Sequence, residues 1–144
     1  MMRRTAVVAL LALLLSGCSG GAAVSDFGTV IKGAKGTTVQ VQVRAGQRFS
    51  LAVAENPSVG DAWDLPALPD TKIASFISAE REAHGDAPGT GGTAYFVFHA
   101  KLPGSTEIRL RDCWRCGPDK VPPDEESRRQ SGEAIFAITV GPAR

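Results

Sequence analysis

The feature that most constrains the fold is a repeated alternation of apolar and polar residues in short segments. Residues 39–43 place three valines on one side of two glutamines, a spacing typical of a strand with one buried face. The same period of two recurs along the chain, in residues 49–53, 93–100, 104–110 and 134–140. Shorter strand candidates lie at residues 63–65 and 73–80.

Glycine and proline separate these segments, and no long helical period appears after the N-terminal region. Roughly six to eight short strands in about a hundred residues predict an all-β fold, an immunoglobulin-like β-sandwich. A small β-barrel is the alternative. Residues 39–43 and 49–53 are adjacent and of equal length, so we expect them to pair as a hairpin across residues 44–47.

The N-terminal region has the pattern of an export signal. Two arginines precede an apolar run at residues 5–15, which is too short to span a membrane. The run ends in Leu-Ser-Gly-Cys at Cys18, which resembles the lipobox of bacterial lipoproteins. That resemblance implies cleavage before Cys18 and a lipid on its sulfur. We therefore expect residues 1–17 to be a signal peptide, residues 18–36 a lipidated tether and residues 37–144 the folded domain, exported and anchored to the membrane of a bacterial cell envelope.

The cysteine count agrees with a lipid on Cys18. Of the three cysteines, that assignment leaves Cys113 and Cys116, which we expect to form a structural disulfide in an exported protein. A metal site would need about four ligands, and this pair supplies two. Thioredoxin-like redox chemistry is a further alternative, but it belongs to an α/β context. No cofactor is expected.

Charge and motifs exclude other functions. The formal net charge is +1, without the basic patch that nucleic-acid binding requires. Neither His84 nor His99 lies in a recognisable nucleophile arrangement, and the chain has no Gly-x-Ser-x-Gly motif, so we do not expect an enzyme. A monomer is expected.

Three loops interrupt the strands. The first contains Asn56, Pro57, Ser58, Val59 and Gly60, where proline fixes φ and glycine permits a positive φ. Such a loop is stiff, so its immobilisation on a partner costs little entropy. A glycine-rich loop spans residues 82–92, and a long polar loop spans residues 112–131. In a sandwich, alternate loops can meet at one end.

These loops resemble those of the chagasin family of cysteine-peptidase inhibitors. The first loop matches the family pattern at Asn56, Pro57, Gly60 and the following Trp63, and Ser58 is a conservative change. Residues that match the family's Gly-x-Gly-Gly loop are Gly89, Thr90, Gly91 and Gly92. Trp114 matches the aromatic residue of the third loop.

The resemblance implies a reversible inhibitor of papain-like cysteine peptidases whose three loops occlude the active-site cleft. The implied contact residues are 56–60, 89–92 and Trp114. Trp63, by contrast, begins a strand and is expected in the core.

Four positions depart from the family pattern: Val59, Asp61, Asp112 and Cys113. They favour a second hypothesis, a non-inhibitory envelope lipoprotein that serves as a binding or assembly module. If the chain is an inhibitor, Val59→Thr and Asp61→Tyr are expected to strengthen peptidase binding.

Overall fold

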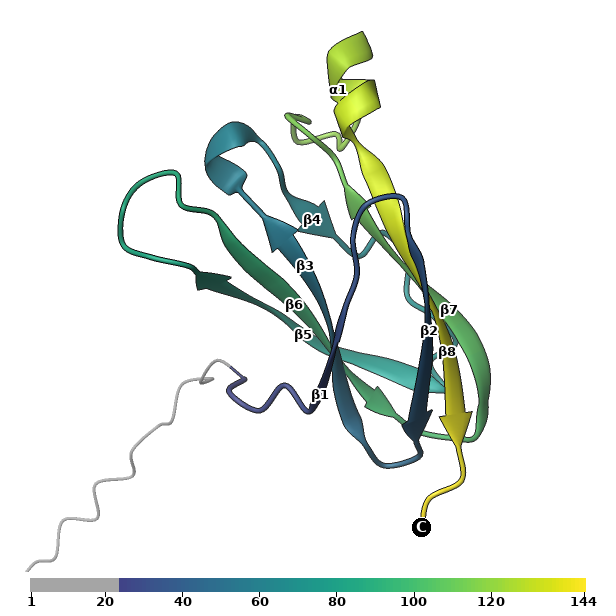
Figure 1. Cartoon of the computed structure of the whole chain (residues 1–144). Coiled ribbons are helices and arrows are strands. Elements are labelled where there is room, and N and C mark those ends of the chain that lie inside the picture. Colours follow the sequence, from purple (N-terminus) through teal and green to yellow (C-terminus); the bar gives the residue numbers. More distant parts are fainter. Residues whose placement is uncertain (1–23) are drawn as a thin grey trace, which may run out of the picture.

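The structure, a computed structural model, describes residues 24–144 as a β-sandwich of two four-stranded sheets (Figure 1). Sheet A contains, in spatial order, β1 (Thr29–Lys32), β3 (Arg48–Glu55), β6 (Gly92–Ala100) and β5 (Ala74–Ala83). Sheet B contains β2 (Thr38–Arg44), β8 (Gly132–Gly141), β7 (Gly104–Asp112) and β4 (Trp63–Asp64). The predicted all-β sandwich is confirmed. The expected signal peptide and Cys18 lie outside the described residues.

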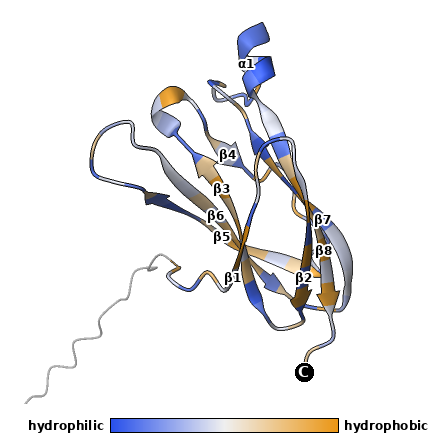
Figure 2. Ribbon diagram, in the orientation of Figure 1, coloured by the Kyte–Doolittle hydropathy of each residue, from blue (hydrophilic) through white to orange (hydrophobic). Residues whose placement is uncertain are grey.

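The strands follow the alternation in the sequence, and apolar residues concentrate along them in Figure 2. In the central strand β6, Ala94, Phe96 and Phe98 are buried, as the period of two predicts. In β7, Ile108 and Leu110 are buried, and Arg109 between them is exposed. The predicted strands are therefore present, with ends that differ by a few residues.

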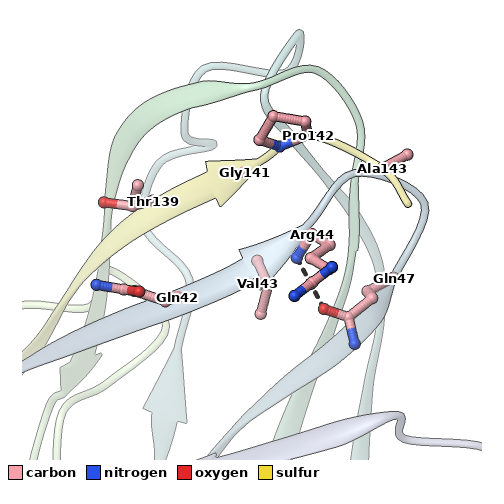
Figure 3. Close-up of a pocket in the computed structure, with 8 residues that line it drawn as sticks. All are labelled: Gln42, Val43, Arg44, Gln47, Thr139, Gly141, Pro142 and Ala143. Atoms are coloured by element: carbon pink, nitrogen blue, oxygen red, sulfur yellow. Dashed lines mark hydrogen bonds between the residues drawn. The ribbon is translucent and has the colours of Figure 1, made fainter.

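The predicted hairpin of β2 and β3 is wrong. β2 pairs in parallel with β8 in sheet B, whereas β3 pairs with β1 and β6 in sheet A. The turn between them closes tightly, since the Arg44 N–H donates to Gln47 Oε1 at 2.7 Å, and an open hollow of about 610 Å³ adjoins it (Figure 3). Alternation is the same for strands of one sheet and of two facing sheets, so it does not reveal which strands pair.

The sandwich also begins earlier than predicted, because β1 lies inside the expected tether, residues 18–36. β1 runs parallel to β3, with Thr29 opposite Phe49. The preceding segment crosses the outer face of sheet A, where Phe27 stacks on Tyr95 with ring centroids 4.4 Å apart. The Phe27 carbonyl accepts a hydrogen bond from Ser50 Oγ at 2.5 Å.

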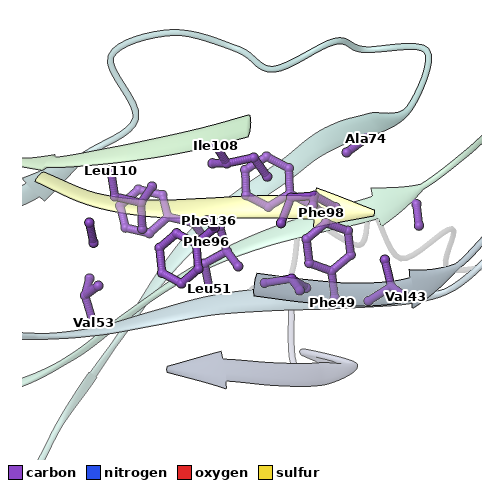
Figure 4. Close-up of a cluster of buried hydrophobic side chains, with 14 of the residues drawn as sticks. Val43, Phe49, Leu51, Val53, Ala74, Phe96, Phe98, Ile108, Leu110 and Phe136 are labelled. Carbon is purple, nitrogen blue, oxygen red and sulfur yellow. The ribbon is translucent and has the colours of Figure 1, made fainter. Parts of the chain in front are cut away.

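One hydrophobic core fills the space between the sheets (Figure 4). Phe49 and Phe98 stack with centroids 5.6 Å apart, and Phe96 and Phe136 are also buried. Trp63 is 4 % exposed, which confirms its predicted place in the core. Each large side chain buried in this way contributes about 1.5–3 kcal/mol, so the core stabilises the sandwich without help from the loops.

A short helix, α1 (Glu125–Gln130), lies in the connection between β7 and β8, where the sequence predicts only a loop. Asp124 caps it by accepting the Ser127 N–H at 2.8 Å, and this hydrogen bond lowers the pKa of Asp124. Acidic residues occupy its first turn and basic residues its last, as the helix dipole favours. Within residues 24–144, no helix is long and apolar enough to cross a membrane.

Candidate functional site

Three loops lie at one end of the sandwich, the upper end in Figure 1. Loop 1, residues 56–62, joins β3 to β4 and contains the one-turn 3₁₀ helix η1 (Pro57–Val59). Loop 2, residues 84–91, joins β5 to β6. Loop 3, residues 113–131, joins β7 to β8 and contains α1. The structure thus places at this end all ten residues that the sequence singles out for contact with a partner, but only nine lie in the loops, since Gly92 is the buried first residue of β6.

Loop 1 is closed by its own hydrogen bonds. The backbone N–H groups of Val59 and Asp61 both donate to the Asn56 carbonyl at 3.1 Å, and the Gly60 N–H donates to the Pro57 carbonyl at 3.1 Å. Pro57 occupies the start of the 3₁₀ turn, where its fixed φ is favourable. Gly60 ends the turn with a φ of 93°, which favours glycine. The loop is therefore stiff, as predicted.

Asp61, one of the departures from the family pattern, takes part in this closure. Its Oδ2 accepts the Asn56 N–H at 3.2 Å, and the residue is only half-exposed. We therefore expect Asp61→Tyr to open the base of loop 1 rather than to strengthen binding. Val59, at 47 % exposure, stays free to contact a partner.

Loop 2 lies beside loop 1 and contacts it through one side-chain hydrogen bond. Asn56 Nδ2 donates to the Gly89 carbonyl at 3.2 Å. Gly91 has a φ of 71° and passes so close to β3 that an added Cβ would lie 3.1 Å from the Glu55 carbonyl oxygen. Thr90 Oγ1 donates to the Ala87 carbonyl at 3.0 Å and so rigidifies the loop from within. A groove of about 280 Å³ separates the two loops.

Loop 3 lies on the other side of loop 1 and joins it through the backbone. The Arg115 N–H donates to the Gly60 carbonyl at 2.9 Å, and the Cys113 N–H donates to the Ala62 carbonyl at 3.3 Å. Arg115 adopts a φ of 54°, which is uncommon for a residue with a side chain. The predicted disulfide of Cys113 and Cys116 is present and brackets this residue, with Cα atoms 5.5 Å apart.

Trp114 lies inside the disulfide bracket and is half-buried. The backbone N–H of Trp114 donates to Ser131 Oγ at 2.9 Å. The Arg115 guanidinium carbon lies 4.3 Å from the centroid of the Trp114 ring. This cation–π contact fixes the two side chains as one unit. Arg115 belongs to no family motif and was not predicted as a contact residue, although its place between two cysteines three residues apart signals a tight turn.

Two of the departures from the family pattern lie beneath the loops instead of on their surface. Asp112 is fully buried and Cys113 is 8 % exposed. Asp112 Oδ1 accepts the Ala62 N–H at 3.1 Å, and its Oδ2 lies 2.5 Å from Lys35 Nζ. These residues therefore bear on how loops 1 and 3 are held, not on contact with a partner.

The carboxyl group of Asp112 has an unusually high pKa. Burial raises its pKa, and a hydrogen bond with the Asp61 carboxyl group raises it further, to about 6. Lys35 opposes both effects but does not overcome them. The junction of loops 1 and 3 thus contains two close carboxyl groups, one of which titrates near neutral pH.

A second ion pair with a buried carboxyl group supports loop 1 from below. Glu55, the last residue of β3, is 5 % exposed, and its Oε1 lies 2.9 Å from Arg81 Nε on β5. Arg81 Nη2 also donates to the Trp63 carbonyl at 3.0 Å. This group fixes both ends of loop 1. No local pattern could have indicated it, because its members are far apart in the sequence.

The fold and the loops define a class of protein: a β-sandwich that presents a cluster of three stiffened loops at one end. The family model of the chagasin family peptidase inhibitors, I42, matches residues 42–127. The chain therefore belongs to the chagasin family of peptidase inhibitors, whose members are inhibitors and not enzymes. A comparison with curated protein sequences finds no match.

Two solved structures with low sequence identity, EhICP2 and Amebosin, share the fold. The cysteine protease inhibitor EhICP2 from Entamoeba histolytica has a TM-score of 0.52 and 14 % identity, over 78 % of this chain and 96 % of that one. Amebosin has a TM-score of 0.53 and 18 % identity, over 78 % of this chain and 98 % of that one. PbICP-C, solved in complex with falcipain-2, has a TM-score of 0.47 and 15 % identity, over 81 % of this chain and 100 % of that one.

Proposed function

We propose that this chain reversibly inhibits papain-like cysteine peptidases by placing loops 1, 2 and 3 in and around the active-site cleft. The observation that carries the proposal is the arrangement of the loops, with loop 1 in the middle, joined to loop 3 by backbone hydrogen bonds and to loop 2 by Asn56. The contact residues are those singled out by the sequence, residues 56–60, 89–92 and Trp114, together with Arg115.

The geometry of loop 1 explains how a peptidase would be blocked without cleaving its inhibitor. The carbonyl groups of Asn56 and Pro57 accept hydrogen bonds within the 3₁₀ turn. They are therefore folded inward, and the loop does not offer an extended peptide to the catalytic nucleophile. Because the loop is already ordered, binding costs little conformational entropy.

Loop 3 supplies the natural anchor of the interface. Aromatic side chains and arginine dominate the binding energy of protein interfaces, and Trp114 and Arg115 form a stacked pair at the end of the molecule. The disulfide fixes the backbone beneath them. Loop 2 would cover the opposite side of the cleft.

Titration of purified residues 19–144 against papain and a lysosomal cathepsin tests the proposal. We expect reversible inhibition at one inhibitor per peptidase, with the chain recovered uncleaved. Trp114→Ala should raise the inhibition constant at least about tenfold, as removal of an interface hot spot does. Leu102→Ala is the matched control, because Leu102 is an exposed apolar residue at the opposite end, and it should leave inhibition unchanged.

Absence of inhibition at micromolar protein, with the disulfide intact, would contradict this function. It would favour the second hypothesis, a non-inhibitory binding or assembly module of the envelope. Thiol–disulfide exchange has less support, since the cysteine pair lies on a loop of a β-sandwich and its first cysteine is buried.

We also propose that the protein is a lipoprotein of a bacterial cell envelope, anchored through Cys18. The support is in the sequence: an apolar run of signal-peptide length that ends in Leu-Ser-Gly-Cys. Cys18→Ser should release the protein from the membrane fraction in a high-salt wash, whereas the unchanged protein should stay. Retention of that variant after a high-salt wash would contradict the anchor.

A further inference from the structure

Three connections meet at the end of the sandwich opposite the loops, the lower end in Figure 1. The Gly46 N–H donates to the Ala100 carbonyl at 2.8 Å, the Lys101 N–H to the Ile73 carbonyl at 2.7 Å and the Leu102 N–H to the Lys72 carbonyl at 3.2 Å. We call this surface the basal pole and define it as residues 44–47, 70–73 and 101–103. Its parts are fixed to one another by backbone hydrogen bonds, so its side chains keep a constant arrangement.

The basal pole is basic. Arg44, Lys72 and Lys101 are exposed, and within residues 24–144 none of the three forms an ion pair. One acidic residue, Asp70, belongs to the pole, and its Oδ1 accepts the backbone N–H of Lys72 at 3.0 Å. At the tip of the turn between β6 and β7, Leu102 is 58 % exposed beside these cations.

The loop end lacks such an excess of positive charge. Loop 3 has four exposed acidic residues, Asp119, Asp124, Glu125 and Glu126, and four exposed basic residues, Arg115, Lys120, Arg128 and Arg129, and loop 2 adds the exposed Asp86. Two of the basic residues of loop 3 lie on α1, where Arg128 pairs with Glu125 at 2.6 Å. A negatively charged surface would therefore attract the basal pole more strongly than the loop end.

We propose that the basal pole docks on the anionic headgroups of a lipid membrane, with Leu102 entering the interface between headgroups and acyl chains. Three unpaired cations around an exposed leucine combine the electrostatic and apolar contributions by which proteins bind anionic membranes. The argument for a membrane as the occupant rests on the lipid anchor proposed above.

The length of the chain before the sandwich supports this occupant. The first described residue, Val24, is held at β5, where its N–H donates to Glu80 Oε1 at 3.2 Å. Six peptide units separate Cys18 from Val24, and they span at most about 21 Å. A lipid on Cys18 would keep the sandwich close to the membrane. The surface charges of the sandwich could then come within about 8 Å of the headgroups, the distance beyond which salt screens their attraction. Docking by the basal pole would leave loops 1, 2 and 3 facing solvent and an approaching peptidase.

Vesicle binding tests the proposal separately from inhibition. The mature chain with Cys18→Ser, which carries no lipid, is sedimented with phosphatidylcholine vesicles that contain or lack one third phosphatidylglycerol. We expect binding to the anionic vesicles only, and its loss at high salt. The variant R44E/K72E/K101E should weaken binding at least about a hundredfold, because each of the three cations near an anionic surface contributes about fivefold. In solution, this variant should inhibit papain as the unchanged protein does.

The matched control is K120E/R128E/R129E, which makes the same charge change in loop 3. It should bind the anionic vesicles nearly as the unchanged chain does, because loop 3 faces away from the docked membrane, and far more tightly than R44E/K72E/K101E. Equal loss of binding in both triple variants, or no binding of the unchanged chain to anionic vesicles at low salt, would overturn the proposal. A failure of papain inhibition alone would count against the proposed function and not against membrane docking.

Discussion

The two contacts of loop 1 differ in how firmly they are made. Toward loop 3, loop 1 has two backbone hydrogen bonds, a buried aspartate that accepts the Ala62 N–H, and a disulfide next to the junction. Toward loop 2, it has the side chain of Asn56 on the Gly89 carbonyl and the close approach of Gly91. Loops 1 and 3 therefore form one rigid body, whereas loop 2 can adjust. Loops 1 and 3 can therefore enter a cleft without rearranging, and loop 2 can then close on the partner.

Gly60→Ala should have the largest effect on this arrangement. A Cβ at position 60 would overlap Cγ of Arg115, and the φ of 93° is unfavourable for alanine. We expect the junction of loops 1 and 3 to separate and the inhibition constant for papain to rise about 100-fold, measured by titration of the peptidase.

Gly46→Ala provides the control for backbone strain. Gly46 has a φ of 91°, but an added Cβ would meet no atom within 4 Å, and the residue lies at the basal pole. This variant should lose a little stability, as strain at a positive φ predicts, and should inhibit papain normally. Equal inhibition by the two variants would contradict a rigid junction of loops 1 and 3.

Removal of the disulfide should have the next largest effect. Cys113→Ser with Cys116→Ser frees the turn that holds Trp114 and Arg115, so we expect inhibition to weaken about tenfold. The disulfide closes a very short loop and contributes roughly 2 kcal/mol to stability on the chain-entropy model, while the core is untouched. Binding should therefore suffer more than the melting temperature. A variant that melts much earlier but inhibits normally would assign the disulfide to the fold alone.

The comparison also shows what the sequence could predict. Strands β2, β3, β6, β7 and β8 follow from alternation, because this pattern is local and one apolar face of each strand packs into the core. Gly60, Gly91 and Trp114 could be singled out because turn chemistry and a family motif depend on neighbouring residues. The pairing of β2 with β8 could not, since it joins segments almost a hundred residues apart.

The ion pairs beneath the loops could not be predicted from the sequence either. Glu55 and Arg81, or Asp112 and Lys35, look like ordinary surface charges until the fold buries one member of each pair. β1 has mostly exposed side chains and no clear alternation, so it was included in the tether. The signal for α1 was present, in the cap at Asp124 and the acidic-to-basic order that follows, but a helix of six residues has no apolar period.

The junction of loops 1 and 3 should also give stability a pH dependence. The pKa of Asp112 is raised from 3.8 to about 6 in the folded chain, so the protonated carboxyl group favours folding. That contribution is complete below 3.8 and is lost as the pH rises through about 6. We expect the melting temperature of the unchanged protein to fall by a few degrees over this interval, and that of Asp112→Asn to fall less.

Glu107→Gln is the control for this measurement, because Glu107 lies on the same strand but is exposed and paired with Arg109. Its melting profile should follow that of the unchanged protein. Parallel profiles for Asp112→Asn and the unchanged protein would show that Asp112 does not titrate as burial and Asp61 imply.

Asn56→Ala should have the smallest effect, because it breaks side-chain hydrogen bonds alone: the one from Asn56 Nδ2 to the Gly89 carbonyl, between loops 1 and 2, and the one from Ser58 Oγ to Asn56 Oδ1, within loop 1. The Asn56 carbonyl, which closes the 3₁₀ turn, is a backbone group and stays in place. We expect inhibition to weaken about fivefold, the value of one neutral hydrogen bond, and amide hydrogen exchange to rise in loop 2 but not in loop 3. If exchange rose equally in loops 2 and 3, all three loops would form a single cooperative unit. The difference between the two sides of loop 1 would then be one of geometry, without consequence for their stability.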